Sequence, residues 1–324
     1  MELSNSLKQR FIKDYNLPIQ VFDKEYFDYY LDLYEESFGT RTKMDRLIYL
    51  INSQFNGNCQ LFLDEYAKVR DNIICTIENS ESYKSFNAFD MSKYKIPSLG
   101  ISSTNIYNEN NDGKYFISID LKKANFQALN YHDKNILLNS DTYNEFIGHF
   151  TNLEYVKESK YTRQVIFGKW NPKRTITIEK YMMYQVLSSP YPTISEWFEI
   201  GKVVSFAVDE IIIEIPKEKI RDFAIVNLRE LQEAIQDFHK FNVDVEFFQL
   251  KKHEFRTVGN DNKMVCYTKE FVHPQKEDEL MGVPNFYYAQ VYKLLNGFGL
   301  CETDKIFYHN NQVAQFIHYL QKVD

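Results

Sequence analysis

Residues 203–216, VVSFAVDEIIIEIP, place two adjacent carboxylates, Asp209 and Glu210, inside an otherwise apolar, β-prone run. Burying an unpaired carboxylate costs free energy, so one continuous buried strand through this point is disfavoured. The run therefore predicts two short strands, 202–208 and 211–215, with the acids at the turn between them. Two interpretations of that turn stay open on spacing alone, an ordinary acidic hairpin tip and a metal site.

A second β-prone run also ends in an acid. Residues 114–120, KYFISID, alternate as a strand does and finish at Asp120. An antiparallel sheet can bring this end beside Asp209 and Glu210, where three carboxylates would raise one another's pKa. A divalent cation relieves such repulsion, and Mg²⁺ takes one or two carboxylates plus substrate phosphates. The pattern predicts that Asp120 and Asp209 hold Mg²⁺ or Mn²⁺, with Glu210 as a supporting acid.

The segment between the two acidic strand ends is strongly basic. Residues 157–174, KESKYTRQVIFGKWNPKR, interleave Lys and Arg with aromatic residues and contain a single acid, Glu158. Such a segment could face the phosphates of a nucleotide, although a basic helix is equally typical of a solvated surface.

The order and wording of these three segments resemble the polymerase domain of family A DNA polymerases. ISIDLKKANFQALNYHD is similar to motif A of that family, TRQVIFGKW to motif B on a fingers helix, and AVDEIIIEIP to motif C. The resemblance implies a palm in which Asp120 and Asp209 hold two Mg²⁺ ions and Glu210 supports the site. It also implies that Arg163 binds the incoming triphosphate, with Lys169, Lys173 and Arg174 nearby.

The resemblance covers roughly residues 97–255 and departs from the family at several positions. Val208 stands where the family has a His that touches the primer end, and Asn125 stands where motif A has a Glu that helps to exclude ribose. The Tyr expected after the Phe-Gly of motif B is missing, since Trp170 and Asn171 lie there. Asp209 follows Asp120 by only 89 positions, which implies reduced fingers and a small polymerase of phage or mobile-element type.

The rest of the chain predicts an α+β fold with an antiparallel palm sheet, reduced fingers and an N-terminal helical region. The expected divisions are 1–96 (helical, thumb-like or accessory), 97–272 (palm with reduced fingers) and 273–324 (helical). Hydrophobic periodicity and turn residues give the individual elements. Helices are expected over 21–38, 42–55, 59–77, 121–133, 140–150, 176–187, 216–241, 283–300 and 310–324, and a hairpin of strands over 243–255 and 263–271.

Composition limits the partners. No run of 18 uncharged apolar residues occurs, so no membrane span is expected, and the N-terminus lacks the apolar core of a secretory signal. The four Cys are scattered, which favours reduced thiols and a cytoplasmic location. A net charge of −7 argues against a chain coated in nucleic acid but allows a local basic channel. Lys251 and Lys252 could follow a primer backbone, or lie at an exposed strand end.

These features lead to one main functional hypothesis and two alternatives. The main one is a template-directed nucleotidyltransferase that extends a primer on a nucleic-acid template with nucleoside triphosphates, with replication proteins as further partners. One alternative is a palm without catalysis that binds nucleic acid or a replication partner. The other is a primase or a reverse-transcriptase-like polymerase, which the change at Asn125 motivates.

Overall fold

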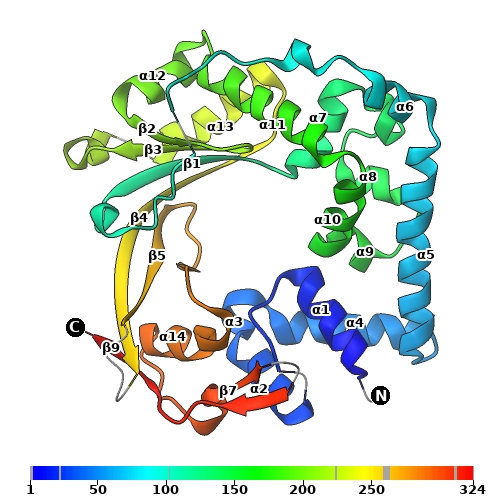
Figure 1. The fold of residues 1–324 in the computed structure, drawn as a ribbon, viewed down its shortest axis with the longest axis vertical. Coiled ribbons are helices and arrows are strands. Elements are labelled where there is room, and N and C mark those ends of the chain that lie inside the picture. The colour runs from blue at the N-terminus through cyan, green and yellow to red at the C-terminus, as the bar shows by residue number, and fades with distance from the viewer. Residues whose placement is uncertain are drawn as a thin grey trace.

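A computed structural model describes residues 3–21, 23–101, 103–222, 225–257, 263–309 and 312–323. Figure 1 shows the elements arranged as a ring, with the large sheet and its covering helices along one side. The long helix α5 (Cys59–Glu78) joins this side to the N-terminal helices, and α14 (Tyr288–Leu295) lies beside those helices. No helix in the described part of the chain is both long enough and apolar enough to cross a membrane.

Helices dominate the first ninety residues, as predicted, and recur between the strands. Asp23 occupies the N-cap position of α2, where a helix start was expected. The remaining helices of the N-terminal region are α1 (Asn5–Tyr15), α2 (Lys24–Leu33), α3 (Glu35–Phe38), α4 (Thr40–Gln54) and α6 (Glu81–Ala88). Those that follow the first strand are α7 (Ala124–His132), α8 (Tyr143–Gly148), α9 (Glu154–Glu158), α10 (Lys160–Lys169), α11 (Pro172–Leu187), α12 (Pro192–Ile200) and α13 (Ile225–His239).

The main sheet is antiparallel and has the strand order β2-β3-β1-β4-β5-β6, with β9 added to the outer end of β4. Together with the helices it confirms the α+β class. The strands are β1 (Tyr115–Leu121), β2 (Lys202–Phe206), β3 (Glu210–Ile215), β4 (Val243–Thr257), β5 (Lys263–His273), β6 (Glu279–Met281) and β9 (Leu320–Val323). A separate hairpin pairs β7 (Ile306–His309) with β8 (Gln312–Gln315).

Alternation along β1 gives the sheet two different faces. Ile117 and Ile119 point into the main core, which α7, α11 and α13 complete. Ser118 and Asp120 lie on the opposite face, which is less completely covered. Because paired residues on neighbouring strands share a face, the acidic ends of β1 and β3 lie on the same side of the sheet.

Two predictions about the later part of the chain were wrong. Residues 310–324 were expected to be helical, but the described part of this segment forms β8 and β9. The pairing supplies the reason for the last strand, since β9 forms its main-chain hydrogen bonds with Glu254–Thr257 of β4, far away in sequence. The helix expected from Pro216 begins later, at Ile225, after a 3₁₀ turn over Lys217–Asp222.

A buried carboxylate joins the N-terminal helices to the middle of the chain. Asp14 on α1 is 1% exposed and accepts hydrogen bonds from the hydroxyls of Tyr66 (2.7 Å), Tyr155 (2.8 Å) and Ser159 (2.6 Å). Ser159 is also the N-cap of α10, where its hydroxyl accepts from the Thr162 N–H at 2.9 Å. The start of α10 is therefore fixed against α1 and α5.

Asp14→Ala is expected to destabilise the chain by about 3 kcal/mol, because three buried hydroxyls lose their acceptor. Urea unfolding measures this change. Tyr15→Phe provides the control, since among the described residues the Tyr15 hydroxyl donates to an exposed acid, Glu158, at 3.2 Å. A similar small loss in both variants would contradict the role assigned to Asp14.

Candidate functional site

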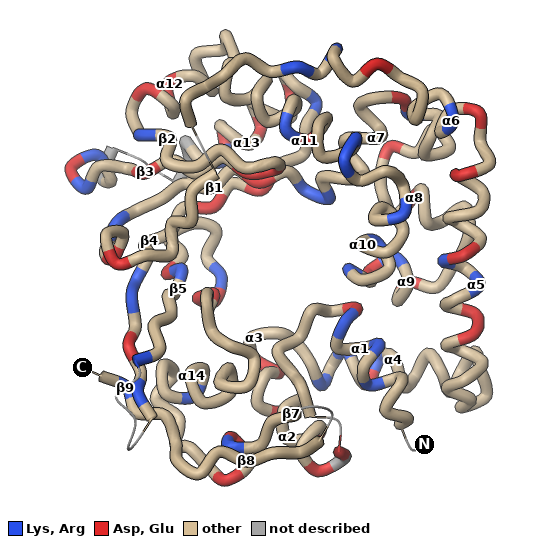
Figure 2. The backbone as a smooth tube through the Cα atoms, viewed as in Figure 1, with Lys and Arg blue, Asp and Glu red and all other residues tan. Residues whose placement is uncertain are grey.

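The two predicted acidic strand ends meet in the folded chain. Asp120 lies opposite Glu210 of β3 on one side and opposite Asp244 of β4 on the other. The Leu121 N–H donates to the carbonyl of Asp209 at 2.9 Å, and the Ala207 N–H donates to the carbonyl of Glu210 at 2.9 Å, closing a tight turn. Figure 2 shows acidic positions gathered at these strand ends, with basic positions on the helices beside them. An antiparallel sheet was expected to bring these two strand ends together, and the pairing of β1 with β3 does so.

Carboxylates in this row differ in how they are neutralised. The Ser118 hydroxyl donates to Glu210 at 2.6 Å, and Lys122 forms an ion pair with Asp244 at 2.8 Å. Asp120 and Asp209 form no ion pair with any described residue. Burial, followed by the charges of Asp209 and Glu210, raises the pKa of Asp120 to about 7. Like charges that face one another across strands destabilise a sheet. These carboxylates therefore lower the stability of the folded chain, and a purely structural role does not explain them.

A further buried carboxylate, Glu179, lies on α11, which packs against β3. Glu179 is 3% exposed and accepts a hydrogen bond from the Asn125 amide at 2.6 Å. Burial and then the charge of Asp209 raise its pKa to about 7, against the opposing effect of the Asn125 bond. The sequence interpretation missed Glu179. A signal was present, because this acid falls on the buried stripe of α11 with Ile178, Met182 and Met183.

Two cations lie on one buried aromatic ring beside the strand end. Lys123 and Arg163 approach the ring centre of Tyr143 at 5.0 and 5.8 Å, and Tyr143 is 1% exposed. Partial desolvation of its ammonium group, followed by the charge of Arg163, lowers the pKa of Lys123. Neither cation forms an ion pair with a described carboxylate. No carboxylate among the described residues offsets the repulsion between these two cations, so the pair is suited to bind an anion.

The turn after β1 holds Lys123 in an unusual conformation. Lys123 has φ 49° and ψ 47°, the left-handed region that non-glycine residues adopt only at a cost. Gln127 fixes the turn, since its amide donates to the carbonyl of Asn242 at 2.6 Å and its oxygen accepts from the Asn242 N–H at 2.7 Å. No side chain caps the first N–H groups of α7, and uncapped helix starts favour anions.

The other predicted nucleotide-binding residues are not gathered around Arg163. Lys169 follows Arg163 by six residues on α10, which is about 240° around a helix. Lys173 is exposed on the first turn of α11. Arg174 packs on Phe86 and donates to the carbonyl of Phe89, so it holds α11 against the end of α6. Lys123, which the sequence interpretation missed, shares the Tyr143 ring with Arg163.

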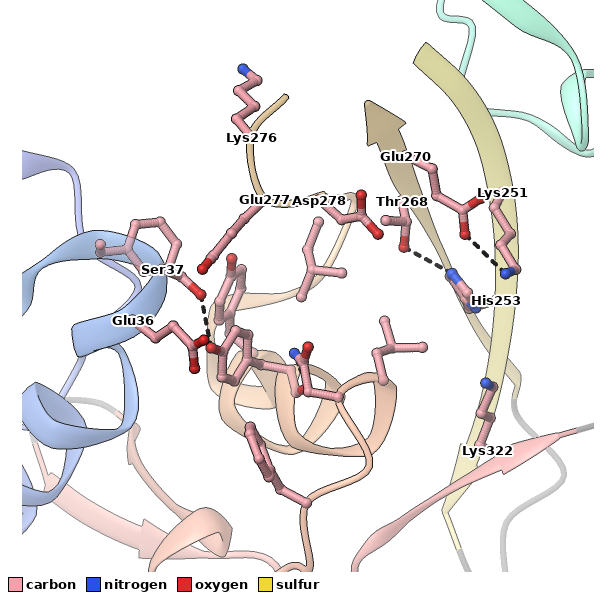
Figure 3. A pocket seen from close by; sticks show the side chains of 17 residues that line it. Glu36, Ser37, Lys251, His253, Thr268, Glu270, Lys276, Glu277, Asp278 and Lys322 are labelled. Carbon is pink, nitrogen blue, oxygen red and sulfur yellow. Dashed lines mark hydrogen bonds and ion pairs between the residues drawn. The ribbon is translucent and has the colours of Figure 1, made fainter. Parts of the chain in front are cut away.

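The two lysines predicted to contact nucleic acid are paired within the protein. Lys251 forms an ion pair with Glu270 at 2.9 Å, and Lys252 pairs with Glu109 at 2.6 Å and Glu254 at 2.5 Å. Lys251 also lines a cavity of about 550 Å³ between the β4–β5 hairpin and α14, drawn in Figure 3. Lys251 follows Asp244 by seven residues, roughly 23 Å along a strand. Nucleic-acid contact by these lysines stays a prediction.

The carboxylates fit a hard divalent cation through their donor chemistry. Asp120 and Asp209 offer oxygen ligands, which Mg²⁺ prefers, and their repulsion would fall on binding. Two protein carboxylates suffice for Mg²⁺ when water and phosphate complete its coordination. Within the described ranges, however, no group of three or more His, Cys, Asp or Glu side chains lies close enough to hold a metal ion. The fit is therefore to a cation that Asp120 and Asp209 would hold and that water, or substrate phosphates when they are bound, would complete.

Comparison with known proteins adds no relative: no protein-family model, curated protein or solved structure matches the chain. The resemblance to family A polymerases therefore rests on the quoted motifs alone.

The raised pKa of Asp120 gives a pH-dependent stability. A carboxyl whose pKa is higher in the folded chain favours folding below its ordinary pKa near 4, and this contribution is lost as pH rises through about 7. In EDTA, the stability of the wild type relative to Asp120→Asn is therefore expected to fall between pH 5 and pH 8. The variant should be more stable at pH 8 by on the order of 1 kcal/mol, after allowing for partial exposure. Urea unfolding at both pH values tests this, and a constant difference would contradict it.

Proposed function

We propose that the chain is a small template-directed nucleotidyltransferase, a DNA polymerase built on a reduced family A-like palm. One observation carries the proposal: the pairing of β1 with β3 brings Asp120, near the end of β1, beside the turn that holds Asp209, and neither carboxylate forms an ion pair with a described residue. The cations Lys123 and Arg163 lie on the elements that follow. Phosphoryl transfer requires carboxylates that hold a metal ion and, beside them, basic side chains that bind phosphate.

In the proposed reaction, each group has a defined part. The primer 3′ oxygen attacks the α-phosphorus of a nucleoside triphosphate, a new P–O bond forms, and the bond to the β-phosphate breaks as pyrophosphate leaves. The hydroxyl proton passes to solvent. Asp120 and Asp209 would hold Mg²⁺, which when bound lowers the charge repulsion between phosphate and nucleophile. Lys123 and Arg163 bind the phosphates. The hydrogen bond from the Ser118 hydroxyl holds the Glu210 carboxylate in place.

A primer-extension panel tests the proposal. Deoxy- and ribonucleotides are each supplied on DNA and RNA templates, with Mg²⁺, with Mn²⁺ and with EDTA. Cation-dependent extension is expected in at least one combination, and the combination that works separates a DNA polymerase from a primase or a reverse transcriptase. No extension in any lane would reject the proposal.

A second candidate is a palm that binds nucleic acid without catalysis. The lack of a three-ligand metal group among the described residues favours it. In that case primer–template would bind in gel-shift assays with equal affinity in Mg²⁺ and EDTA, and no nucleotide would be incorporated.

A further inference from the structure

Glu179 is a buried carboxylate in an apolar setting. On α11 its buried neighbours on the same stripe are Ile178, Met182 and Met183, and Glu179 itself is 3% exposed. Among the described residues no Lys, Arg or His forms an ion pair with it. A carboxylate buried without a positive partner is costly, so a purely structural role would be served better by an apolar side chain.

The contacts of Glu179 direct it to the acidic strand ends. Within the described part of the chain its side-chain hydrogen bond comes from Asn125, which lies on the first turn of α7, five residues after Asp120. The packing of α7 against α11 brings the two side chains to 2.6 Å. The next residue on α11, Lys180, lies 5.7 Å from the ring centre of Phe206, which ends β2 three residues before Asp209. Because α11 also packs against β3, Glu179 approaches the turn that holds Asp209 from the helical layer.

We propose that Glu179 is a positioning residue for the cation of the proposed polymerase site, adding negative charge behind Asp209 while Asn125 fixes its carboxylate. This inference rests on the proposed function. Glu179 is not itself a ligand here; it increases the affinity of Asp120 and Asp209 for a divalent cation through its charge. The alternative is a strut that only joins α7 to α11.

Glu179→Gln separates the two roles, because Gln keeps the shape and can still accept the Asn125 hydrogen bond but carries no charge. Melting temperatures of the full chain are measured at pH 8 in EDTA and across a titration with Mg²⁺ alone. We expect Glu179→Gln to melt higher than the wild type in EDTA and to bind Mg²⁺ about fivefold more weakly, as one unit charge several ångströms away predicts. Asp237→Asn on the exposed side of α13 removes the same net charge and should leave Mg²⁺ affinity unchanged.

A second variant keeps the test informative if Glu179→Gln does not fold. Asn125→Ala leaves the charge in place without its hydrogen bond and is expected to weaken Mg²⁺ binding about twofold.

The outcomes distinguish this inference from the proposed function. Equal Mg²⁺ affinity in the wild type and Glu179→Gln overturns the role of Glu179 but leaves the site at Asp120 and Asp209 intact. A wild type whose melting does not respond to Mg²⁺ overturns both. Equal weakening in Glu179→Gln and Asp237→Asn reduces the effect to net charge and also overturns the inference.

Discussion

Replacing Asp120 or Asp209 by Asn is expected to lower Mg²⁺-dependent primer extension by about a thousandfold or more, while the chain stays folded. Each substitution removes one of the two unpaired carboxylates at the strand ends, and a bound cation contributes several kcal/mol to phosphoryl transfer at about 1.4 kcal/mol per tenfold. Single-turnover extension measures the loss.

The stability of these variants distinguishes a functional acid from a structural one. A structural carboxylate would lower stability when removed. Asp120 faces like charges on both neighbouring strands, so Asp120→Asn should be at least as stable as the wild type without cations. Asp237→Asn, on an exposed turn of α13, is the matched control and should retain full activity. An active Asp120→Asn, or an inactive Asp237→Asn, would contradict the assignment.

Arg163→Ala is expected to lower kcat/KM for the nucleoside triphosphate by about 30- to 100-fold. Charged hydrogen bonds to phosphate contribute roughly 1.5–3 kcal/mol each, and Arg163 lies over Tyr143 without a carboxylate partner among the described residues. Lys123→Ala should show a similar but smaller loss, because Lys is a point charge and holds phosphate in one place. Steady-state extension with varied nucleotide measures both.

Two other basic residues provide the comparison for this prediction. Lys169 and Lys173 belong to the same basic run but do not share the Tyr143 ring with Arg163. Their Ala variants are expected to change kcat/KM less than threefold, in keeping with exposed charges. A larger loss in Lys169→Ala than in Lys123→Ala would move the phosphate site to the other side of α10.

The parts of the fold that the sequence predicted well are local. Alternation and acidic ends marked β1 and β3, and helical periodicity marked α4, α5 and α11. Their meeting could be expected as well, since antiparallel pairing of two short strands with acids at one end leaves few registers. The last strand could not be predicted locally, because β9 is specified by its pairing with β4 rather than by its own sequence.

The residues of the candidate site also fall into those that the local sequence predicts and those that only the packing of distant elements brings into place. Asp120 and Asp209 stand out because a carboxylate ends an apolar strand. Glu179 and Lys123 come into place through contacts between distant elements, the packing of α7 on α11 and the approach of α8 to α10. The basic run 157–174 showed that cations were present, but it did not show which of them lie on the same side of the helices. Arg174 was therefore assigned to nucleotide binding, although it packs on Phe86.

Template-dependent addition of a single labelled nucleotide to a primer 3′ end tests the central claim most directly. With Mg²⁺ present, the wild type is expected to add the nucleotide that pairs with the first template base and to add none in EDTA, while Asp209→Asn adds none in either. Addition that ignores the template base, or that persists in Asp209→Asn, would contradict a palm whose catalytic centre is built on Asp120 and Asp209.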